Sequence, residues 1–171
     1  MIRGRTTALP FLFLLAATAG CGLVGTSTIT MSSKSMEPTI MAGTDVSPRS
    51  TDGHYAPHLG DIIVYRTPKN WTNVTPDQLR VSRVIGVPGS TVSCCDPQGR
   101  LQVNGKALDE AYLAAPPASQ LRFEVQVPPG RLWVMGDNRH AALDSRAHLA
   151  DPGHGTIETS QVVGVVDPAR R

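Results

Sequence analysis

Three serines lie close together in SSKSMEPTI, residues 32–40, directly before a Pro-Thr pair. In extended backbone alternate residues share a side, so Ser33 and Ser35 are expected to face the same way while Lys34 points away. This placement makes Ser35 a candidate nucleophile and Ser33 a hydroxyl neighbour able to donate to an oxyanion. A serine-rich exit from a membrane segment is the alternative, but it leaves the following Met-x-Pro-Thr unexplained.

A second polar segment, GDNRHAALDSR, covers residues 136–146. Its two acids and two arginines follow a glycine, and this composition suits a buried or half-buried ion-pair network. Asp137 and Asn138 are expected to satisfy backbone groups of the turn. His140 lies in the same segment and is a candidate base, because an imidazole titrates in the useful range. An exposed loop histidine is the alternative interpretation.

The elements that must position these two segments are mainly short strands. Runs rich in Val, Ile and aromatic residues, separated by Gly, Pro, Asn and Asp, cover residues 28–33, 61–67, 79–87, 90–95, 100–105, 121–127, 131–136 and 161–166. Loops are expected at residues 54–60, 67–78 and 148–160. Eight short strands with few helical windows predict a mostly β fold, an antiparallel barrel or sandwich-like domain.

The N-terminal region predicts attachment to a membrane. Two arginines precede an uncharged apolar run at residues 8–25, which is long enough for a short membrane-spanning apolar helix with its positive flank on the cytoplasmic side. A lipoprotein-type signal ending at Cys21 is the alternative. Simple cleavage to a secreted soluble domain is less favoured, because no well-placed Ala-x-Ala site is present. The chain is therefore divided into residues 1–25 and an outward-facing β domain at residues 26–171.

Composition argues against several other classes of protein. A net charge of +2 over 171 residues is too small to indicate nucleic-acid binding. The five histidines have no cysteine or paired carboxylate nearby at ligand spacing, so neither a metal nor another cofactor is expected. Cys94 and Cys95 are adjacent in sequence, and we expect two unpaired thiols, with a disulfide between the neighbours as the alternative.

Several segments occur in the order and approximate spacing seen in type I signal peptidases, and the chain resembles that family. They are SKSMEPT (33–39), LGDIIVYRTP (59–68), SRVIGVPGSTV (82–92), VNGKALDEAYL (103–113), VPPGRLWVMGDNR (127–139) and DSR (144–146). These enzymes are membrane-anchored serine endopeptidases that remove signal peptides from exported proteins. The resemblance implies that Ser35 is the nucleophile and Ser33 the oxyanion-hole serine. It also implies that Asp144 and Arg146 form an ion pair that supports the active site.

The resemblance breaks at the general base. Bacterial signal peptidases carry a lysine immediately before the arginine of a K-R-x-x-G-x-x-G block, where desolvation keeps it neutral so that it accepts the serine proton. Here that position is Ser82, and the histidine of eukaryotic and archaeal relatives is absent as well. The small hydroxyl residue that contacts the lysine corresponds to Ala142. Both parts of the base site are therefore changed.

The remaining basic residues are poor substitutes for this lysine. Lys34 is expected to point away from the nucleophile, and Lys69 and Lys106 fall in a loop and a turn. Arg80 shares a strand face with the serine at the base position but stays protonated at biological pH. His140 is the best remaining candidate.

These observations predict a signal peptidase I-like membrane-bound serine endopeptidase with weak or lost activity. Its expected partners are signal peptides of exported pre-proteins and membrane lipid. The alternatives are a catalytically inactive protein that still binds signal peptides and a purely structural membrane-tethered β domain. An extended substrate is expected between residues 26–32 and 79–83, because main-chain hydrogen bonds to an added strand do not require the base.

Overall fold

The computed structural model describes residues 28–167, and most of its regular structure is β. The apolar helix predicted at residues 8–25, and Cys21 within it, lie outside this range. No helix within residues 28–167 is both long and apolar enough to span a bilayer. The helical elements in this range are two short 3₁₀ turns, η1 (Ser145–His148) and η2 (Thr159–Gln161).

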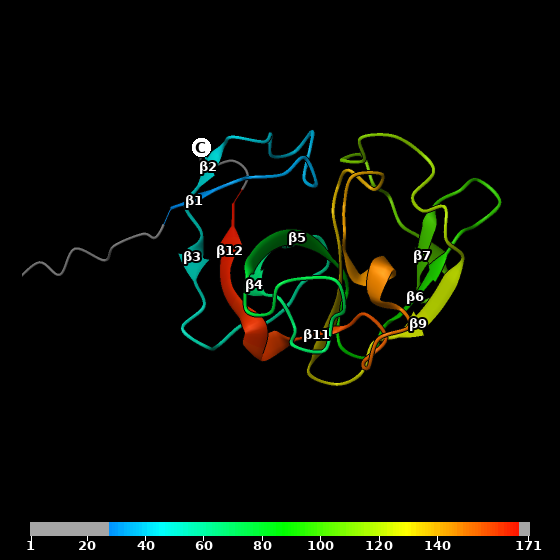
Figure 1. The fold of residues 1–171 in the computed structure, drawn as a ribbon. Helices are drawn as coiled ribbons and strands as arrows, with labels where there is room; N and C mark the ends of the chain where they lie inside the picture. Colours follow the sequence, from blue (N-terminus) through cyan, green and yellow to red (C-terminus); the bar gives the residue numbers. More distant parts are fainter. Residues whose placement is uncertain (1–27, 168–171) are drawn as a thin grey trace, which may run out of the picture.

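The strands of this range form three antiparallel sheets (Figure 1). The largest sheet has the order β11 (Ile157–Glu158), β10 (Arg131–Met135), β5 (Leu79–Gly86), β4 (Ile62–Arg66), β12 (Val162–Val166) and β3 (Arg49–Ser50). A second sheet has the order β8 (Lys106–Ala107), β7 (Leu101–Val103), β6 (Thr91–Cys94) and β9 (Phe123–Gln126). β1 (Ile29–Thr30) pairs with β2 (Asp45–Val46). The end strands β11 and β3 do not meet, so the largest sheet is not a closed barrel.

The mostly β, antiparallel fold predicted from the sequence is confirmed, and each predicted strand segment contains a strand. A closed barrel, which was one form of this prediction, is not found. The short strands β2, β3, β8 and β11 were not predicted, because two residues are too few to show an alternating pattern. The loop predicted at residues 148–160 holds β11 and the start of η2, whereas residues 54–60 and 67–78 contain no strand.

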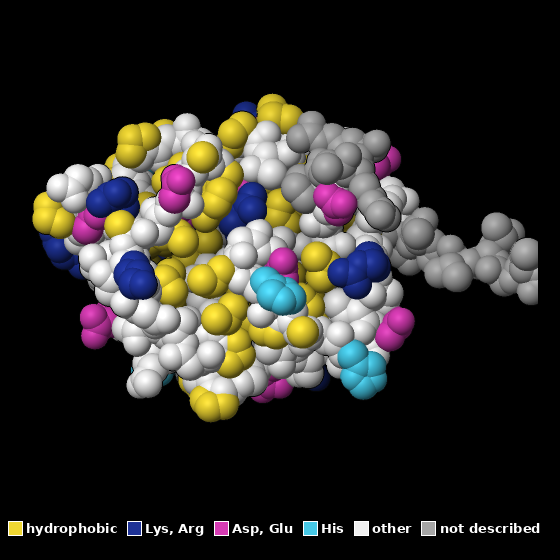
Figure 2. Space-filling view, turned by 180° about the vertical axis from the view of Figure 1, so that it is seen from behind, with side chains coloured by type: hydrophobic (Ala, Val, Ile, Leu, Met, Phe, Trp, Pro, Cys, Tyr) yellow, Lys and Arg dark blue, Asp and Glu magenta, His cyan; other side chains and the backbone are white. Residues whose placement is uncertain are grey.

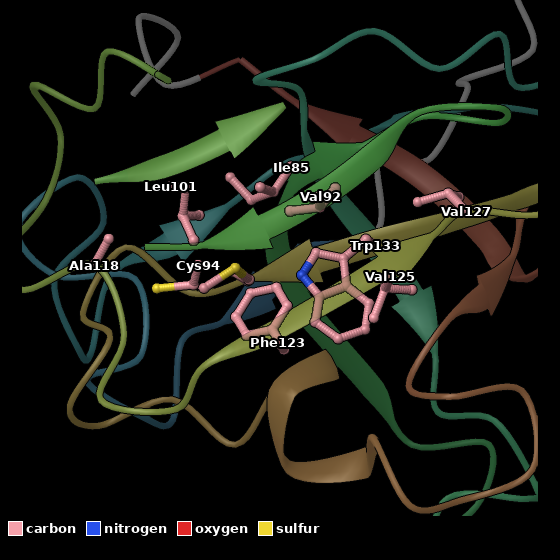
Figure 3. Packing of buried hydrophobic residues seen from close by; sticks show 10 residues of the cluster. Ile85, Val92, Cys94, Leu101, Ala118, Phe123, Val125, Val127 and Trp133 are labelled. Atoms are coloured by element: carbon pink, nitrogen blue, oxygen red, sulfur yellow. The ribbon is translucent and has the colours of Figure 1, made fainter. Parts of the chain in front are cut away.

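The second sheet covers one hydrophobic cluster with a single face. Buried and more exposed residues alternate along β6, β7 and β9, as expected for strands with one face on a core. Figure 3 shows Trp133 and Phe123 side by side in this cluster, with ring centroids 5.2 Å apart. Trp133 comes from β10, so the cluster joins the second sheet to the largest one.

The central strand β4 separates two other hydrophobic clusters. Ile62 and Val64 belong to the cluster that contains Met36, and Tyr65 on the other face belongs to a cluster with Trp71. These β4 residues are buried because both faces of the strand are covered. The side chain of Met36 is fully buried, so it anchors the serine-bearing turn to the core.

Cys94 and Cys95 are joined by a disulfide, so the expectation of two unpaired thiols is wrong. Both sulfur atoms approach the carbonyl oxygen of Ser119, at 3.9 Å and 3.6 Å, where β6 ends. Elsewhere on the surface, the face shown in Figure 2 carries interspersed acidic and basic side chains with hydrophobic side chains gathered between them.

Candidate active site

Ser33 and Ser35 lie in a series of bends and turns, so the extended backbone expected for this segment is wrong. Their hydroxyl oxygens are nevertheless 3.0 Å apart, within hydrogen-bonding distance. The turn is closed by the N–H of Ile40, which donates to the carbonyl of Met36 at 2.9 Å. Lys34 is exposed. Turn geometry, and not strand alternation, therefore brings the two hydroxyls together.

The segment after β10 holds this turn in place. The N–H of Asn138 donates to the carbonyl of Ser35 at 2.9 Å, and the Thr39 hydroxyl donates to the carboxylate of Asp137. Gly136 lies so close that an added Cβ would be 2.5 Å from the Ser35 carbonyl oxygen. Any side chain at this position would push the candidate nucleophile out of place, which explains why the segment begins with glycine.

Asp137 was expected to satisfy backbone groups of its own turn, and this expectation is wrong. Its side chain binds Arg83 instead. Its carboxylate accepts hydrogen bonds from Arg83 Nε at 2.8 Å and Nη2 at 2.6 Å, and both side chains are buried. Arg83 also donates to the carbonyl of Gly60 at 2.8 Å and lies over the Tyr112 ring, 3.9 Å from its centroid. The pair forms because Met135, at the end of β10, is in register with Arg83 on β5.

Asp144 and Arg146 form the predicted ion pair. Arg146 donates from Nε and Nη2 to the two carboxylate oxygens of Asp144, each at 2.8 Å, and both side chains are buried. Asp144 caps η1 by accepting the N–H of Arg146, and it accepts the N–H of Gly136 at 3.0 Å. Arg146 also donates to the carbonyl of Arg139 at 2.8 Å. The pair therefore links the two ends of the loop between β10 and η1.

A groove of about 250 Å³ lies beside the two serines. Its lining comes from residues 29–33 and 35, 78–82, and 141–144. Four residues that the sequence analysis singled out thus share one cavity: Ser33, Ser35, Ser82 and Asp144. Arg146 does not line the groove and contacts it through Asp144.

One wall of the groove is a strand edge without a neighbour. β4 pairs with residues 79–83 of β5, whereas β10 pairs with β5 only from residue 83 onward. Within residues 28–167, the edge of residues 79–82 that faces away from β4 is therefore unpaired. β1, which also lines the groove, pairs on one side only, with β2. An extended peptide can add its main-chain hydrogen bonds to such edges.

Ser82, which the sequence analysis assigned to the position of the missing lysine, is buried beside a residue that sequence reasoning missed. The Tyr65 hydroxyl lies 3.4 Å from the Ser82 hydroxyl, and the Tyr65 side chain is fully buried. Burial raises the pKa of Tyr65 to about 12, although its contact with Ser82 and the charge of Arg80 act in the opposite direction. Tyr65 is therefore neutral near pH 7 and does not accept a proton there. Its place follows from its register opposite Arg80 in the β4–β5 pair.

His140 is exposed and lines a different depression, together with Ser119 and Arg146. It is not among the residues that line the groove. No lysine or histidine occurs among the described residues lining that groove, whose basic residue is Arg80. Residues 28–167 also contain no group of three or more His, Cys, Asp or Glu residues arranged to hold a metal ion.

Comparison with known proteins decides the family. The family described as "Signal peptidase, peptidase S26" matches residues 5–169, nearly the whole chain. The chain belongs to this signal peptidase family. The resemblance found in the sequence motifs is thereby confirmed.

Similar proteins of this family come from several bacteria. "Signal peptidase I" of Mycobacterium tuberculosis is 36% identical over 151 residues, which cover 64% of this chain and 50% of that protein. "Probable signal peptidase I" of Mycobacterium leprae is 34% identical over 185 residues, covering 77% of this chain and 64% of that protein. The chain thus spans about half to two thirds of the length of these relatives.

A solved structure shares the fold. The crystal structure of a signal peptidase I from Enterococcus faecalis is 30% identical in sequence and superposes with a TM-score of 0.52. The match covers 66% of this chain and 98% of that one. The mostly β, antiparallel architecture described above is therefore the architecture of a signal peptidase I.

Proposed function

We propose that this chain binds signal peptides of exported pre-proteins in the groove and is a signal peptidase I-like serine endopeptidase with weak or lost activity. Membership of the signal peptidase family supports the substrate class and the reaction. The lining of the groove supports the weak activity, because the two serine hydroxyls are present while no lysine or histidine is found among its described residues.

The chemistry assigns one role to each serine. Ser35 Oγ attacks the carbonyl carbon of the scissile peptide bond, and Ser33 Oγ donates a hydrogen bond to the oxyanion that forms. The Ser35 proton must pass to a base before the amine of the mature protein can leave. Ser82 is not basic enough for this step, so the assistance of a general base, typically about 10²–10⁴ in rate, is missing.

The unpaired edges of β1 and β5 support peptide binding without this base. An extended peptide forms main-chain hydrogen bonds with both edges, and its side chains enter the groove alternately. Residues 8–25 tether the β domain of residues 26–171 to membrane lipid on the extracytoplasmic face. Asp144 and Arg146 support the site by holding the loop that touches the Ser35 turn.

A catalytically inactive signal-peptide-binding protein is the second candidate. The hydroxyls of Tyr65 and Ser82 favour it, because they lie 3.4 Å apart in a buried position and neither is a base near pH 7. Such a protein keeps the strand edges and the groove and does not cleave.

The test uses the full chain in detergent micelles with a labelled pre-protein and a labelled signal peptide. Wild type is compared with Ser35→Ala and Ser82→Lys, and Lys106→Ala on exposed β8 is the control. Slow cleavage that is lost in Ser35→Ala supports the weak enzyme, and peptide binding without cleavage supports the inactive one. Cleavage that survives Ser35→Ala, or failure to bind any signal peptide, contradicts the proposal.

A further inference from the structure

Arg80 brings a positive charge into the groove. It lies on β5 opposite Tyr65 and on the same strand face as Ser82. Its Nη1 donates to the carbonyl oxygen of Leu143 at 3.0 Å, and Leu143 also lines the groove. This hydrogen bond fixes the guanidinium between β5 and the loop that precedes η1.

No charge in the described part of the chain neutralises this guanidinium. Within residues 28–167, no carboxylate oxygen lies within 4.0 Å of Arg80, although eight other Arg, Lys or His side chains are paired at that distance. Asp144, the carboxylate that lines the groove, is occupied by Arg146 and by the N–H of Gly136. Tyr65 stays neutral near pH 7, because burial raises its pKa to about 12.

Arg80 also has a free donor. Its Nε is buried and has no hydrogen-bond partner in the part of the chain that the structure describes. A partly buried guanidinium with an unsatisfied N–H is costly unless an acceptor with negative charge arrives. The planar guanidinium matches a carboxylate in particular, because two N–H groups donate to its two oxygens.

We propose that Arg80 binds a carboxylate of the peptide that occupies the groove. This rests on the proposed function, since it names a chemical group of the same ligand. Two sources supply such a carboxylate. One is the free C-terminal carboxylate of a signal peptide that has already been cut, and the other is an Asp or Glu side chain of an uncut peptide.

The hydroxyls of the groove suit the first source. When a peptide bond is cleaved, the carbonyl that faced the nucleophile becomes a carboxylate, so it lies near Ser33 and Ser35, whose hydroxyls donate hydrogen bonds. Arg80 lines the same groove and supplies the compensating charge. Capture of a C-terminal carboxylate is a recurrent mode of peptide recognition. The site then retains the cut signal peptide.

Three labelled peptides of one sequence test this with the full chain in detergent micelles, by fluorescence anisotropy. The first ends in a free carboxylate, the second ends in an amide, and the third ends in an amide but carries one Glu near its end. Wild type is expected to bind the first roughly tenfold more tightly than the second, the gain of one charge-assisted pair. Tighter binding of the third peptide instead assigns the carboxylate to a side chain.

Variants connect the preference to Arg80. Arg80→Met is expected to bind the carboxylate and amide peptides equally, whereas Arg80→Lys keeps part of the preference. Arg66→Met, on the exposed end of the neighbouring strand β4 and outside the groove, is the matched control and keeps all of it. Thermal unfolding of each variant shows that the fold is intact.

Two results overturn the proposal while leaving the groove as a peptide site. One is equal affinity of wild type for all three peptides, a comparison that needs no variant. The other is a preference for the carboxylate that survives in folded Arg80→Met. Failure of every peptide to bind wild type overturns the proposed function itself, and the carboxylate site with it.

Discussion

The hydroxyls of Tyr65 and Ser82 are buried and lie 3.4 Å apart. The contact arises because Tyr65 on β4 and Ser82 on β5 share one face of the largest sheet. Burial keeps the tyrosine neutral by raising its pKa to about 12. The position that the sequence motif predicts for the base therefore holds hydroxyl groups, which donate and accept hydrogen bonds but do not take up a proton near pH 7.

Full activity of a restored base should require a change at Tyr65 as well as at Ser82. Ser82→Lys is expected to raise cleavage of a pre-protein above the wild-type background. Ser82→Lys with Tyr65→Phe is expected to raise it further, by up to about 10²–10⁴ over wild type. Removal of the tyrosine hydroxyl makes room for the longer lysine side chain. The apolar surroundings of the lysine amine then lower its pKa by desolvation. Initial rates on a labelled pre-protein measure the effect.

Ser35→Ala in the same background is the control, and it should return cleavage to background. Adding Ala142→Ser supplies a hydroxyl from the loop that lines the groove, which should orient the new amine and increase the rate again. Background activity in every lysine variant would mean that the groove lacks more than a base. Equal activity of the single and double variants would mean that Tyr65 does not obstruct the lysine.

His140→Ala should leave any Ser35-dependent cleavage by wild type unchanged. His140 is exposed and lines a depression other than the groove of Ser35, so it is badly placed to take the serine proton. The measurement is the residual rate of both proteins across roughly pH 5 to 8. A rate that disappears in His140→Ala and falls with decreasing pH in wild type would instead identify His140 as the base.

The strands were predictable because their hydrophobic pattern is local. Runs such as residues 61–67 and 131–136 carry their own evidence, and the turns between them contain Gly, Pro, Asn and Asp. The order of the strands within each sheet, and the open state of the largest sheet, depend on pairings between distant segments. Neither was readable from one sequence.

The two serines and the Asp144–Arg146 pair of the candidate site were predictable. In both cases the two residues belong to one sequence motif and are close neighbours in the chain. The partner of Asp137 was missed because Arg83 lies 54 positions away and meets it only through the register of β10 with β5. Tyr65 was missed for a similar reason. An apolar run such as that of β4 identifies a buried strand but not which hydroxyl meets Ser82.

Gly136→Ala should displace the Ser35 turn. The added methyl carbon would lie 2.5 Å from the Ser35 carbonyl oxygen and 2.5 Å from the Cβ of Ala142, closer than such contacts occur. We expect a loss of about 1–3 kcal/mol in the free energy of unfolding, together with weaker binding of signal peptide. Urea unfolding and fluorescence anisotropy measure the two effects.

Gly136→Ala with Ala142→Gly is the matched comparison, since it removes one of the two clashes and leaves the one with Ser35. This double variant should recover part of the lost stability and little of the peptide binding. Wild-type behaviour of Gly136→Ala in both measurements would show that the Ser35 turn is not held by this close contact.

Breaking the Asp144–Arg146 pair should destabilise the domain strongly. Asp144→Asn or Arg146→Ala leaves the other partner buried without compensation, which typically costs about 3–5 kcal/mol. Lys34→Ala, at an exposed side chain, should change the free energy of unfolding by less than about 0.5 kcal/mol. Urea unfolding of the three variants makes the comparison. Similar small effects at all three positions would show that the pair contributes no more than a surface ion pair.

Stability should also fall in acid through Asp151. Its carboxylate accepts the N–H and hydroxyl of Thr72, at 2.8 Å and 2.9 Å, and lies 2.8 Å from His148 Nδ1. These contacts, the Thr72 N–H above all, lower the pKa of Asp151 from its usual 3.8. The folded state then binds a proton less readily than the unfolded state, so the stabilisation is complete above about pH 4 and is lost as pH falls through the lowered pKa.

Urea unfolding between about pH 7 and pH 2 tests this on wild type and Asp151→Asn. The wild-type free energy of unfolding should decline below about pH 4, and the decline should be shallower in Asp151→Asn, because the amide does not titrate. Some decline should remain, since hydrogen bonds led by the N–H of Arg100 also lower the pKa of Asp96. Asp109→Asn, at an exposed carboxylate, is the control and should follow wild type. Parallel curves for wild type and Asp151→Asn would show that Asp151 has the same pKa in the folded and unfolded states.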